Sequence, residues 1–186
     1  MIGKQVLKEI EEEMKKAIEA TKREFAELRS GRANPKMVEG IRVNYYGTST
    51  LLKEIAMVSI PEARLIVINP YDPNSLKEIE RAILQSELGI TPLNDGKLIR
   101  LVIPPLSEER RQELIKIVRK LAEEGKVSIR TIRRNGKEKI KNLEKDKKIS
   151  EDDRFKAEEE LQKLTDKYIE EIDKLLEEKE KELREF

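Results

Sequence analysis

The chain of 186 residues has no histidine, no cysteine and no tryptophan, and it has only four tyrosines and three phenylalanines. Without histidine or cysteine it cannot build the common zinc sites, a disulfide, or a nucleophile paired with histidine. An imidazole general base is excluded for the same reason. Most hydrolase mechanisms are thereby ruled out, and we predict a protein that is not an enzyme, with no catalytic residues, no metal and no cofactor.

Long apolar segments are missing as well. The longest apolar runs have four residues, as from Leu65 to Ile68, whereas a transmembrane helix needs about 20. The first residues, MIGKQVLKEIEEE, lack the apolar segment of a secretory signal. Together with the lack of cysteine, these features indicate a cytoplasmic protein with no membrane partner.

Charge, by contrast, is abundant: charged residues make up 41% of the chain, although the net charge is only +1. Residues 106–150 hold 15 basic and 8 acidic side chains, net +7, and residues 151–186 hold 8 basic and 15 acidic ones, net −7. Two helices with these charges could neutralise each other across a shared seam. Alternatively, the positive segment could present its charge to a polyanion.

The basic residues of the positive segment favour the second interpretation. Wound at about 100° per residue, many of them fall in a stripe about 100° wide along one helix. They are Arg119, Lys126, Arg130, Arg133, Arg134, Lys137, Lys141 and Lys148. An apolar stripe that includes Val118, Ile129 and Ile140 lies about a third of a turn away and would fix the helix on a core. The cationic edge would then face outward, where arginine binds phosphate oxygens well.

The stripe has almost no aromatic residues, which narrows the kind of nucleic acid it would suit. Single-stranded RNA or DNA is usually bound by stacking bases on aromatic side chains. A cationic stripe without such residues gains affinity mainly through phosphate contacts and counterion release. We therefore expect it to bind the surface of a folded nucleic acid.

Apolar residues recurring every three or four positions predict three long helices, at 3–29, 107–146 and 151–184. Helices of this length should pack side by side as an elongated bundle. Residues 31–105 differ, because they contain strand-like segments and one shorter helical pattern. The strand-like segments are 41–47, 56–60, 64–69 and 97–103, the helical pattern is 74–89, and Asp95-Gly96 is a predicted hairpin turn.

This order of elements predicts an α+β protein in which the bundle is discontinuous. The first helix needs the other two to bury its apolar residues, so residues 1–30 and 106–186 form the bundle. Residues 31–105 form a small strand-rich domain, inserted through two neighbouring crossings that we interpret as a hinge. The hinge residues are Ser30, Gly31 and Arg32 on one crossing, and Pro104 and Pro105 on the other.

Two adjacent carboxylates, Asp152 and Asp153, could in principle serve in acid–base chemistry or bind a metal ion. Ser150 lies three residues before Asp153, which is the spacing of a capping box at a helix N-terminus. We therefore interpret these residues as a helix cap.

Several segments together resemble the ribosome recycling factor family. They are LRSGRANP at 28–35, NYYGT at 44–48, PPLSEERR at 104–111, IRTIRRNGKEKIK at 129–141, ISEDD at 149–153 and QKLTD at 162–166. The resemblance covers the whole chain, and the segments in this order are more specific than any one alone. Asn135 stands where the family often has Asp, and Ser30 and Ser107 stand where Thr is common.

The resemblance implies an L-shaped protein, with an elongated three-helix bundle and an inserted small α/β-sandwich domain. It also implies a monomeric translation factor that, with elongation factor G and GTP, splits the ribosome after termination. Its partners would be elongation factor G and the RNA of the large ribosomal subunit. Residues matching the family's RNA contacts are Arg110, Arg130 and Arg133, and helix geometry adds Lys126, Arg134 and Lys137.

Two other functions fit parts of the sequence. A helical chaperone with a mobile head would use exposed apolar surface in place of a basic stripe. A module that binds the ribosome or its tRNA sites would share the stripe, but it should stabilise joined subunits and not separate them.

Overall fold

The computed structural model describes residues 2–186, which form two compact units. One unit comprises the chain up to Arg29 together with Glu108–Glu185, and we call it the bundle. The other comprises Ser30–Ser107 together with Phe186, and we call it the head. None of the helices in the described part of the chain is both long enough and apolar enough to cross a membrane.

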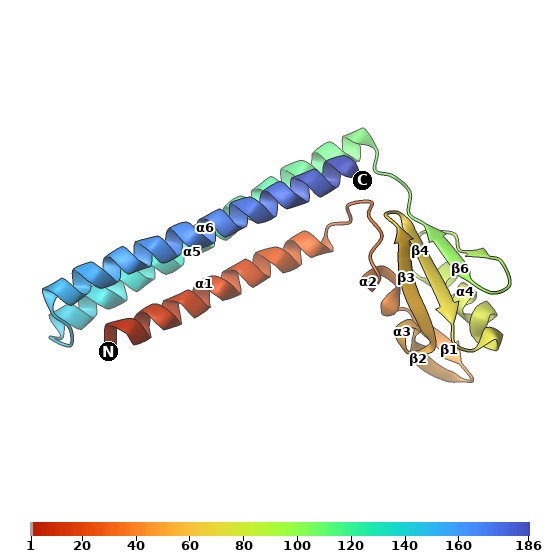
Figure 1. The fold of residues 1–186 in the computed structure, drawn as a ribbon, viewed down its shortest axis with the longest axis horizontal. Coiled ribbons are helices and arrows are strands. Elements are labelled where there is room, and N and C mark those ends of the chain that lie inside the picture. The colour runs from red at the N-terminus through yellow and green to blue at the C-terminus, as the bar shows by residue number, and fades with distance from the viewer. Residues whose placement is uncertain (1) are drawn as a thin grey trace. The chain divides into compact units, whose positions relative to one another are not determined.

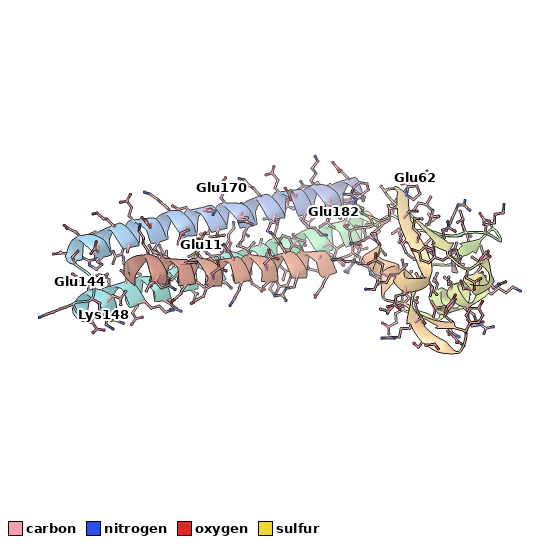
Figure 2. All side chains as sticks on the ribbon, turned by 60° about the horizontal axis from the view of Figure 1, so that its bottom comes forward. Glu11, Glu62, Glu144, Lys148, Glu170 and Glu182 are labelled. Carbon is pink, nitrogen blue, oxygen red and sulfur yellow. The ribbon has the colours of Figure 1, made fainter. Side chains whose placement is uncertain are left out.

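The bundle contains three helices, α1 (Ile2–Glu27), α5 (Glu108–Lys145) and α6 (Glu151–Glu185) (Figure 1). Their ends agree with the predicted helices to within two residues. Acidic side chains occupy the first turns of α5 and α6, where they interact favourably with the positive end of the helix dipole and stabilise the helix. At 1.5 Å per residue, α5 is about 57 Å long. Charged side chains project along the whole length of the three helices (Figure 2).

Apolar residues on the facing sides of the three helices form the bundle core. They include Leu7, Ile10, Met14, Ile18 and Phe25 of α1, Leu114, Val118, Ala122, Ile129 and Ile140 of α5, and Ala157, Leu161, Tyr168, Ile172 and Leu183 of α6. Their spacing of three or four residues is what the sequence pattern requires of helices that bury one side.

Two glycines on the buried side of α5 bring the helices unusually close. A Cβ atom on Gly125 would lie 2.6 Å from Oγ1 of Thr21 and 3.2 Å from Cδ1 of Ile172. A Cβ atom on Gly136 would lie 2.7 Å from Cδ1 of Ile10. Glycine inside a helix costs about 1 kcal/mol relative to alanine, so the close approach of α1 and α6 explains why glycine stands at both positions.

The head contains a four-stranded antiparallel sheet in the order β3-β4-β6-β5 and a separate hairpin of β1 and β2. The strands are β1 (Arg42–Tyr45), β2 (Thr48–Leu51), β3 (Ala56–Glu62), β4 (Leu65–Pro70), β5 (Leu93–Asn94) and β6 (Ile99–Val102). The helices are α2 (Lys36–Glu39), α3 (Leu52–Ile55), the 3-10 helix η1 (Pro73–Ser75) and α4 (Leu76–Gln85).

The head core lies on one face of the four-stranded sheet. Ile66 and Ile68 of β4, with Ile99 and Leu101 of β6, belong to one buried cluster with residues of the helices and of β1. The members outside the sheet include Val38, Val43, Leu52, Ile55, Leu76, Ile79 and Ile83. The helices and the hairpin therefore pack against this face of the sheet.

The predicted strand at 41–47 is shorter than expected. It ends at Tyr45, because Tyr46 and Gly47 both have positive φ (48° and 81°) and form the turn to β2. Two consecutive residues of this kind are typical of the tight turns that join hairpin strands. The predicted turn at Asp95-Gly96 is confirmed between β5 and β6, with a φ of 89° at Gly96.

We expect Gly125→Ala to lower the free energy of unfolding by about 1–2 kcal/mol, since overpacking outweighs the gain in helix propensity. Thr21 has little room to move, because it is 3% exposed and its hydroxyl donates to the carbonyl oxygen of Ala17. Urea denaturation should show the loss and its partial recovery in the double variant Gly125→Ala/Thr21→Ala. The control Gly3→Ala, whose Cβ meets nothing within 4 Å, should not lose stability. A Gly125→Ala variant as stable as the wild type would contradict the close approach.

Candidate nucleic-acid interface

Four of the six predicted RNA-binding residues line one shallow hollow on the outer side of α5. They are Arg130, Arg133, Arg134 and Lys137, and they lie around Val127 and Thr131 in a hollow of about 330 Å³. The residues that line the hollow, at 127–137, lie within about three turns of α5. Part of the predicted stripe therefore forms a concentrated positive surface, which we call the basic hollow.

Two arginines of the basic hollow are not paired with a carboxylate. Among residues 2–186, Arg134 has no hydrogen-bond or ion-pair partner. Arg133 donates from Nη1 to the side-chain oxygen of Gln162 on α6 at 3.1 Å, and this amide is uncharged. No carboxylate among residues 2–186 offsets the charge of either guanidinium group, so both are available to bind an anion.

The other two cations of the basic hollow are weakly paired. Arg130 Nη1 lies 3.0 Å from Oε1 of Glu123, and both side chains are about half exposed (49% and 59%). Lys137 Nζ lies 3.9 Å from Oε2 of Glu158. Exposed pairs of this kind contribute little stability, so a phosphate could replace the carboxylate at modest cost.

One edge of the predicted stripe lies at the seam between α5 and α6. Lys126 forms an ion pair with Asp173, and its side chain is only 18% exposed. Arg119 Nε donates to Oε1 of Glu180 at 2.5 Å. Outward charge and neutralisation at the seam were expected as alternatives, but residues of one stripe take both roles. Lys126 and Arg119 pair with carboxylates of α6. In the basic hollow, Arg133 and Lys137 also reach side chains of α6, whereas Arg130 pairs within α5.

Arg110 stands apart from the basic hollow. It lies in the first turn of α5, 20 residues before Arg130, which corresponds to about 30 Å along the helix. Its Nη1 donates to Oε2 of Glu113 at 2.9 Å. Any contact that it makes with a nucleic acid is therefore separate from the contacts of the hollow.

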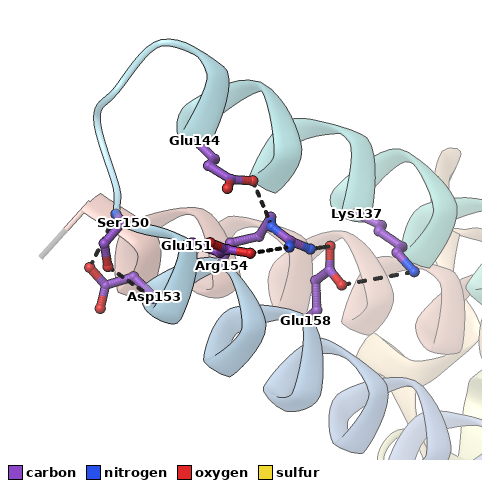
Figure 3. A network of polar contacts seen from close by, with 7 residues as sticks. All are labelled: Lys137, Glu144, Ser150, Glu151, Asp153, Arg154 and Glu158. Carbon is purple, nitrogen blue, oxygen red and sulfur yellow. Dashed lines mark hydrogen bonds and ion pairs between the residues drawn. The ribbon is translucent and has the colours of Figure 1, made fainter.

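A network of ion pairs around Arg154, which was not expected from the sequence, joins α6 to α5 next to the hollow (Figure 3). The Arg154 side chain is 16% exposed, and its guanidinium lies 2.6 Å from a Glu144 oxygen and 3.2 Å from a Glu158 oxygen. Lys137 approaches the same Glu158. A single arginine in the acidic first turn of α6, in EDDRF, is the sequence signal that could have revealed this network.

The predicted cap of α6 is confirmed. The backbone N–H of Asp153 donates to Oγ of Ser150 at 3.1 Å, and the backbone N–H of Ser150 points back to Oδ2 of Asp153 at 3.5 Å (Figure 3). Hydrogen bonds from Ser150 hold the pKa of Asp153 below its ordinary value. Within residues 2–186, no group of three or more carboxylates is placed to hold a metal ion.

On the first predicted crossing, Gly31 has a φ of 78°, which favours glycine. A Cβ there would also lie 2.8 Å from the carbonyl oxygen of Phe186. The Arg32 guanidinium lies 5.4 Å from the centre of the Phe186 ring, and Ser30 is buried. The first crossing is therefore tightly packed around the last residue of the chain.

The two crossings are anchored on the same turn of the head, between β3 and β4. The backbone N–H of Ala33 donates to the carbonyl oxygen of Ala63 at 2.7 Å, and that of Ile103 donates to the carbonyl oxygen of Arg64 at 2.8 Å. Pro104-Pro105 follows directly and offers no N–H to continue the pairing.

Comparison with known proteins gives one consistent result. Residues 21–183 match the family described as ribosome recycling factor. The chain is 54% identical over 184 residues to the ribosome-recycling factor of Halalkalibacterium halodurans, which covers 99% of this chain and all of that protein. It is 55% identical over 175 residues to that of Caldicellulosiruptor bescii, covering 94% of this chain and 95% of that protein.

Two solved structures are similar over nearly the whole chain. A solution structure of a ribosome recycling factor has a TM-score of 0.75 and 46% identity, covering 100% of this chain and 99% of that one. The second contains models of the T. thermophilus ribosome recycling factor and the E. coli elongation factor G bound to the E. coli post-termination complex. Its TM-score is 0.63 at 44% identity, with coverage of 98% and 99%.

The Arg119–Glu180 pair predicts how stability depends on pH. The hydrogen bond from Arg119 holds the pKa of Glu180 below its ordinary value, and Arg184 acts in the same direction. The pair therefore stabilises the fold above the unfolded pKa of about 4.3, and this contribution is lost as pH falls through the folded pKa. We expect Arg119→Met to unfold at lower urea concentration than the wild type at pH 7, with a smaller difference at pH 3.

Arg134→Met is the matched control, because Arg134 has no carboxylate partner among residues 2–186. Its urea midpoint should differ from that of the wild type by the same small amount at both pH values. A difference for Arg119→Met that does not change with pH would show that the pair adds nothing to stability.

Proposed function

The chain belongs to the ribosome recycling factor family, and on this premise we propose that it disassembles the ribosome after termination. With elongation factor G and GTP it separates the subunits, which are then available for a new round of initiation. The basic hollow on α5 is the observation that supports a ribosomal target most directly, because ribosomal RNA presents a folded surface of phosphates. A related factor in the structure that includes elongation factor G is bound to a post-termination complex.

We propose that the bundle binds the RNA of the large subunit through the basic hollow and Arg110. Arg133 and Arg134 are the strongest candidates, because neither is held by a carboxylate. Arg130 and Lys137 would exchange weak carboxylate partners for phosphates. Lys126 would contribute mainly by its long-range charge, since its ammonium already pairs with Asp173. Such contacts position the protein without reading base sequence.

The head would receive force from elongation factor G, and the crossings would transmit it to the bundle. GTP hydrolysis takes place on the partner, so this chain supplies binding and stiffness and catalyses nothing itself. Phosphate release from GTP by the isolated chain would contradict this view. The protein would act as a monomer in the cytoplasm, where ribosomes are found.

Electrostatic binding predicts a dependence on salt. The logarithm of the affinity for large subunits should fall linearly with the logarithm of salt concentration, with a slope set by the number of phosphates contacted. Arg133→Ala and Arg134→Ala should each reduce the slope by about one contact and leave the melting temperature nearly unchanged. Arg81→Ala in the head, where the side chain is 68% exposed, is the matched control. Unchanged salt slopes for both Arg133→Ala and Arg134→Ala would contradict the proposal that the basic hollow binds RNA.

Splitting of post-termination ribosomes can be followed by light scattering with elongation factor G and GTP. The wild-type chain should split them, whereas a module that only occupies the tRNA sites would stabilise the joined subunits. Replacing Pro104 and Pro105 by glycine should loosen the second crossing and slow splitting severalfold, with ribosome binding retained. Pro73→Gly, at an exposed proline elsewhere in the head, should split normally. Normal splitting by the double glycine variant would contradict the proposal that the crossings transmit force from the head to the bundle.

A further inference from the structure

The bundle exposes one aromatic ring. Its aromatic residues are Phe25, Phe155 and Tyr168, and two of them, Phe25 and Tyr168, are only 5% and 3% exposed, as members of the bundle core. Phe155 of α6 is 54% exposed. A single exposed apolar side chain needs no explanation by itself. What this ring can bind therefore depends on what surrounds it.

Arg154 holds the Phe155 ring in place. The guanidinium carbon of Arg154 lies 4.1 Å from the centre of the ring, within the range of a cation–π contact. Arg154 has little freedom to move, because its side chain is 16% exposed and pairs with Glu144 and Glu158 (Figure 3). One face of the ring is thus covered by a fixed guanidinium group, and the exposed part of the ring has a defined orientation.

Phe155 lies on the side of α6 that meets the basic hollow. It precedes Gln162 by seven residues, which is close to two helical turns, so both side chains leave α6 in nearly the same direction. Gln162 accepts the hydrogen bond from Arg133, and Glu158, between Phe155 and Gln162, is the carboxylate that Lys137 approaches. The ring therefore lies beyond the Lys137 end of the hollow, about 10 Å along α6 from Gln162.

The positive stripe of α5 continues to the level of the ring. The step of four residues that leads from Arg133 to Lys137 leads next to Lys141. Because α5 and α6 run antiparallel, Lys141 lies at the level of residues 154–155. Lys141 is exposed, and it has no hydrogen-bond or ion-pair partner in the part of the chain that the structure describes. A phosphate chain that follows α5 would thus pass beside the ring.

The neighbours of Phe155 on α6 suit an uncharged group better than a phosphate. Glu151 and Glu159 lie one turn before and one turn after it, and each is already paired, with Arg154 at 4.0 Å and with Lys163 at 2.9 Å. A nucleobase is uncharged, and every base has a flat face that can stack on an aromatic ring. Folded RNA offers such bases where loops and bulges leave them unpaired.

We propose that Phe155 stacks on an unpaired base of the RNA whose phosphates bind the basic hollow. The inference rests on the proposed function and narrows its target to an RNA segment with a base that is free to leave its own stack. The stripe on α5 has no aromatic residue, and α6 supplies the one that it lacks.

An apolar protein surface is a poorer partner for the ring. Interfaces between proteins have an apolar core made by several residues. Among the bundle side chains that the structure describes, the other large exposed apolar ones are Ile117 and Val127 of α5. By the level at which α5 and α6 meet, both lie about 20 Å or more along the bundle from Phe155. The ring therefore stands alone among charged side chains.

The test separates stacking from charge and from simple apolar contact. Phe155→Leu keeps an apolar side chain beside Arg154 but removes the flat ring, whereas Phe155→Trp enlarges the ring. Affinity for purified large ribosomal subunits is measured at several salt concentrations, beside the melting temperature. The matched control is Tyr71→Leu, which removes an aromatic ring that is 66% exposed in the head.

We expect Phe155→Leu to bind large subunits about tenfold more weakly than the wild type at each salt concentration, because a base loses its stacking partner. The salt slope should not change, since no phosphate contact is lost, and this distinguishes the variant from Arg133→Ala. Phe155→Trp should bind at least as tightly as the wild type, and Tyr71→Leu should bind equally well. The melting temperatures of all three should stay near that of the wild type.

The chain has no tryptophan, so Phe155→Trp also places a single fluorescent reporter at the ring. Stacking on a base should quench its emission when subunits are added, beyond the change that the wild-type chain produces. A blue shift without quenching would assign the ring to an apolar protein surface instead. Wild-type affinity of Phe155→Leu would overturn the stacking proposal alone. A wild-type chain that does not bind large subunits would overturn the proposed function and the stacking proposal together.

Discussion

The close approach of α1 to α5 and α6 is the constraint on which the bundle depends. α1 is separated from the other two helices in the sequence by the entire head, so no short loop holds it in place. Its attachment must come from packing, and Gly125 and Gly136 allow that packing by removing the side chains that would keep α1 away. Polar contacts add to it, among them the hydrogen bond from Tyr168 to Glu11 at 2.8 Å and the ion pair of Lys139 with Glu13 at 3.3 Å.

The opposite net charges of α5 and α6 serve two purposes that the structure separates by direction. Residues of α5 that point toward α6, such as Arg119, find carboxylates there, and the partner Glu180 is only 13% exposed. Arg134, about a sixth of a turn away from Arg119, finds none among residues 2–186. The excess of acidic residues on α6 therefore does not cancel the positive charge of α5 but draws only one edge of it into the seam.

Much of this organisation could be predicted from sequence. The three long helices follow directly from apolar spacing, and the capping box at Ser150 and the turn at Asp95-Gly96 follow from local chemistry. The division of the basic stripe could not be predicted, because it depends on how α6 is rotated against α5. The short elements α2, α3, β2 and β5 were missed, since four residues or fewer carry too little periodicity.

The two faces of β4 could not be told apart in the sequence for a related reason. In β4, the sequence LIVI is apolar at successive positions, so alternation does not reveal which residues face the core. Only the burial of Ile66 and Ile68 shows that Leu65 and Val67 lie on the other side. The run is therefore a strand with two apolar faces, of which one belongs to the head core.

Salt should affect the seam and the basic hollow differently, and this difference suits a factor that binds and leaves repeatedly. Salt screens exposed charges separated by more than a Debye length of about 8 Å, whereas partly buried pairs are screened much less. Arg154 and Glu158 at the seam are only 16% and 18% exposed, so their ion pair should persist at ionic strengths that would release a phosphate from the hollow. On the proposed function, the bundle would thus release RNA without losing its shape. The proposed lever would need that separation, because the force applied to it would have to break contacts with the ribosome before contacts within the protein.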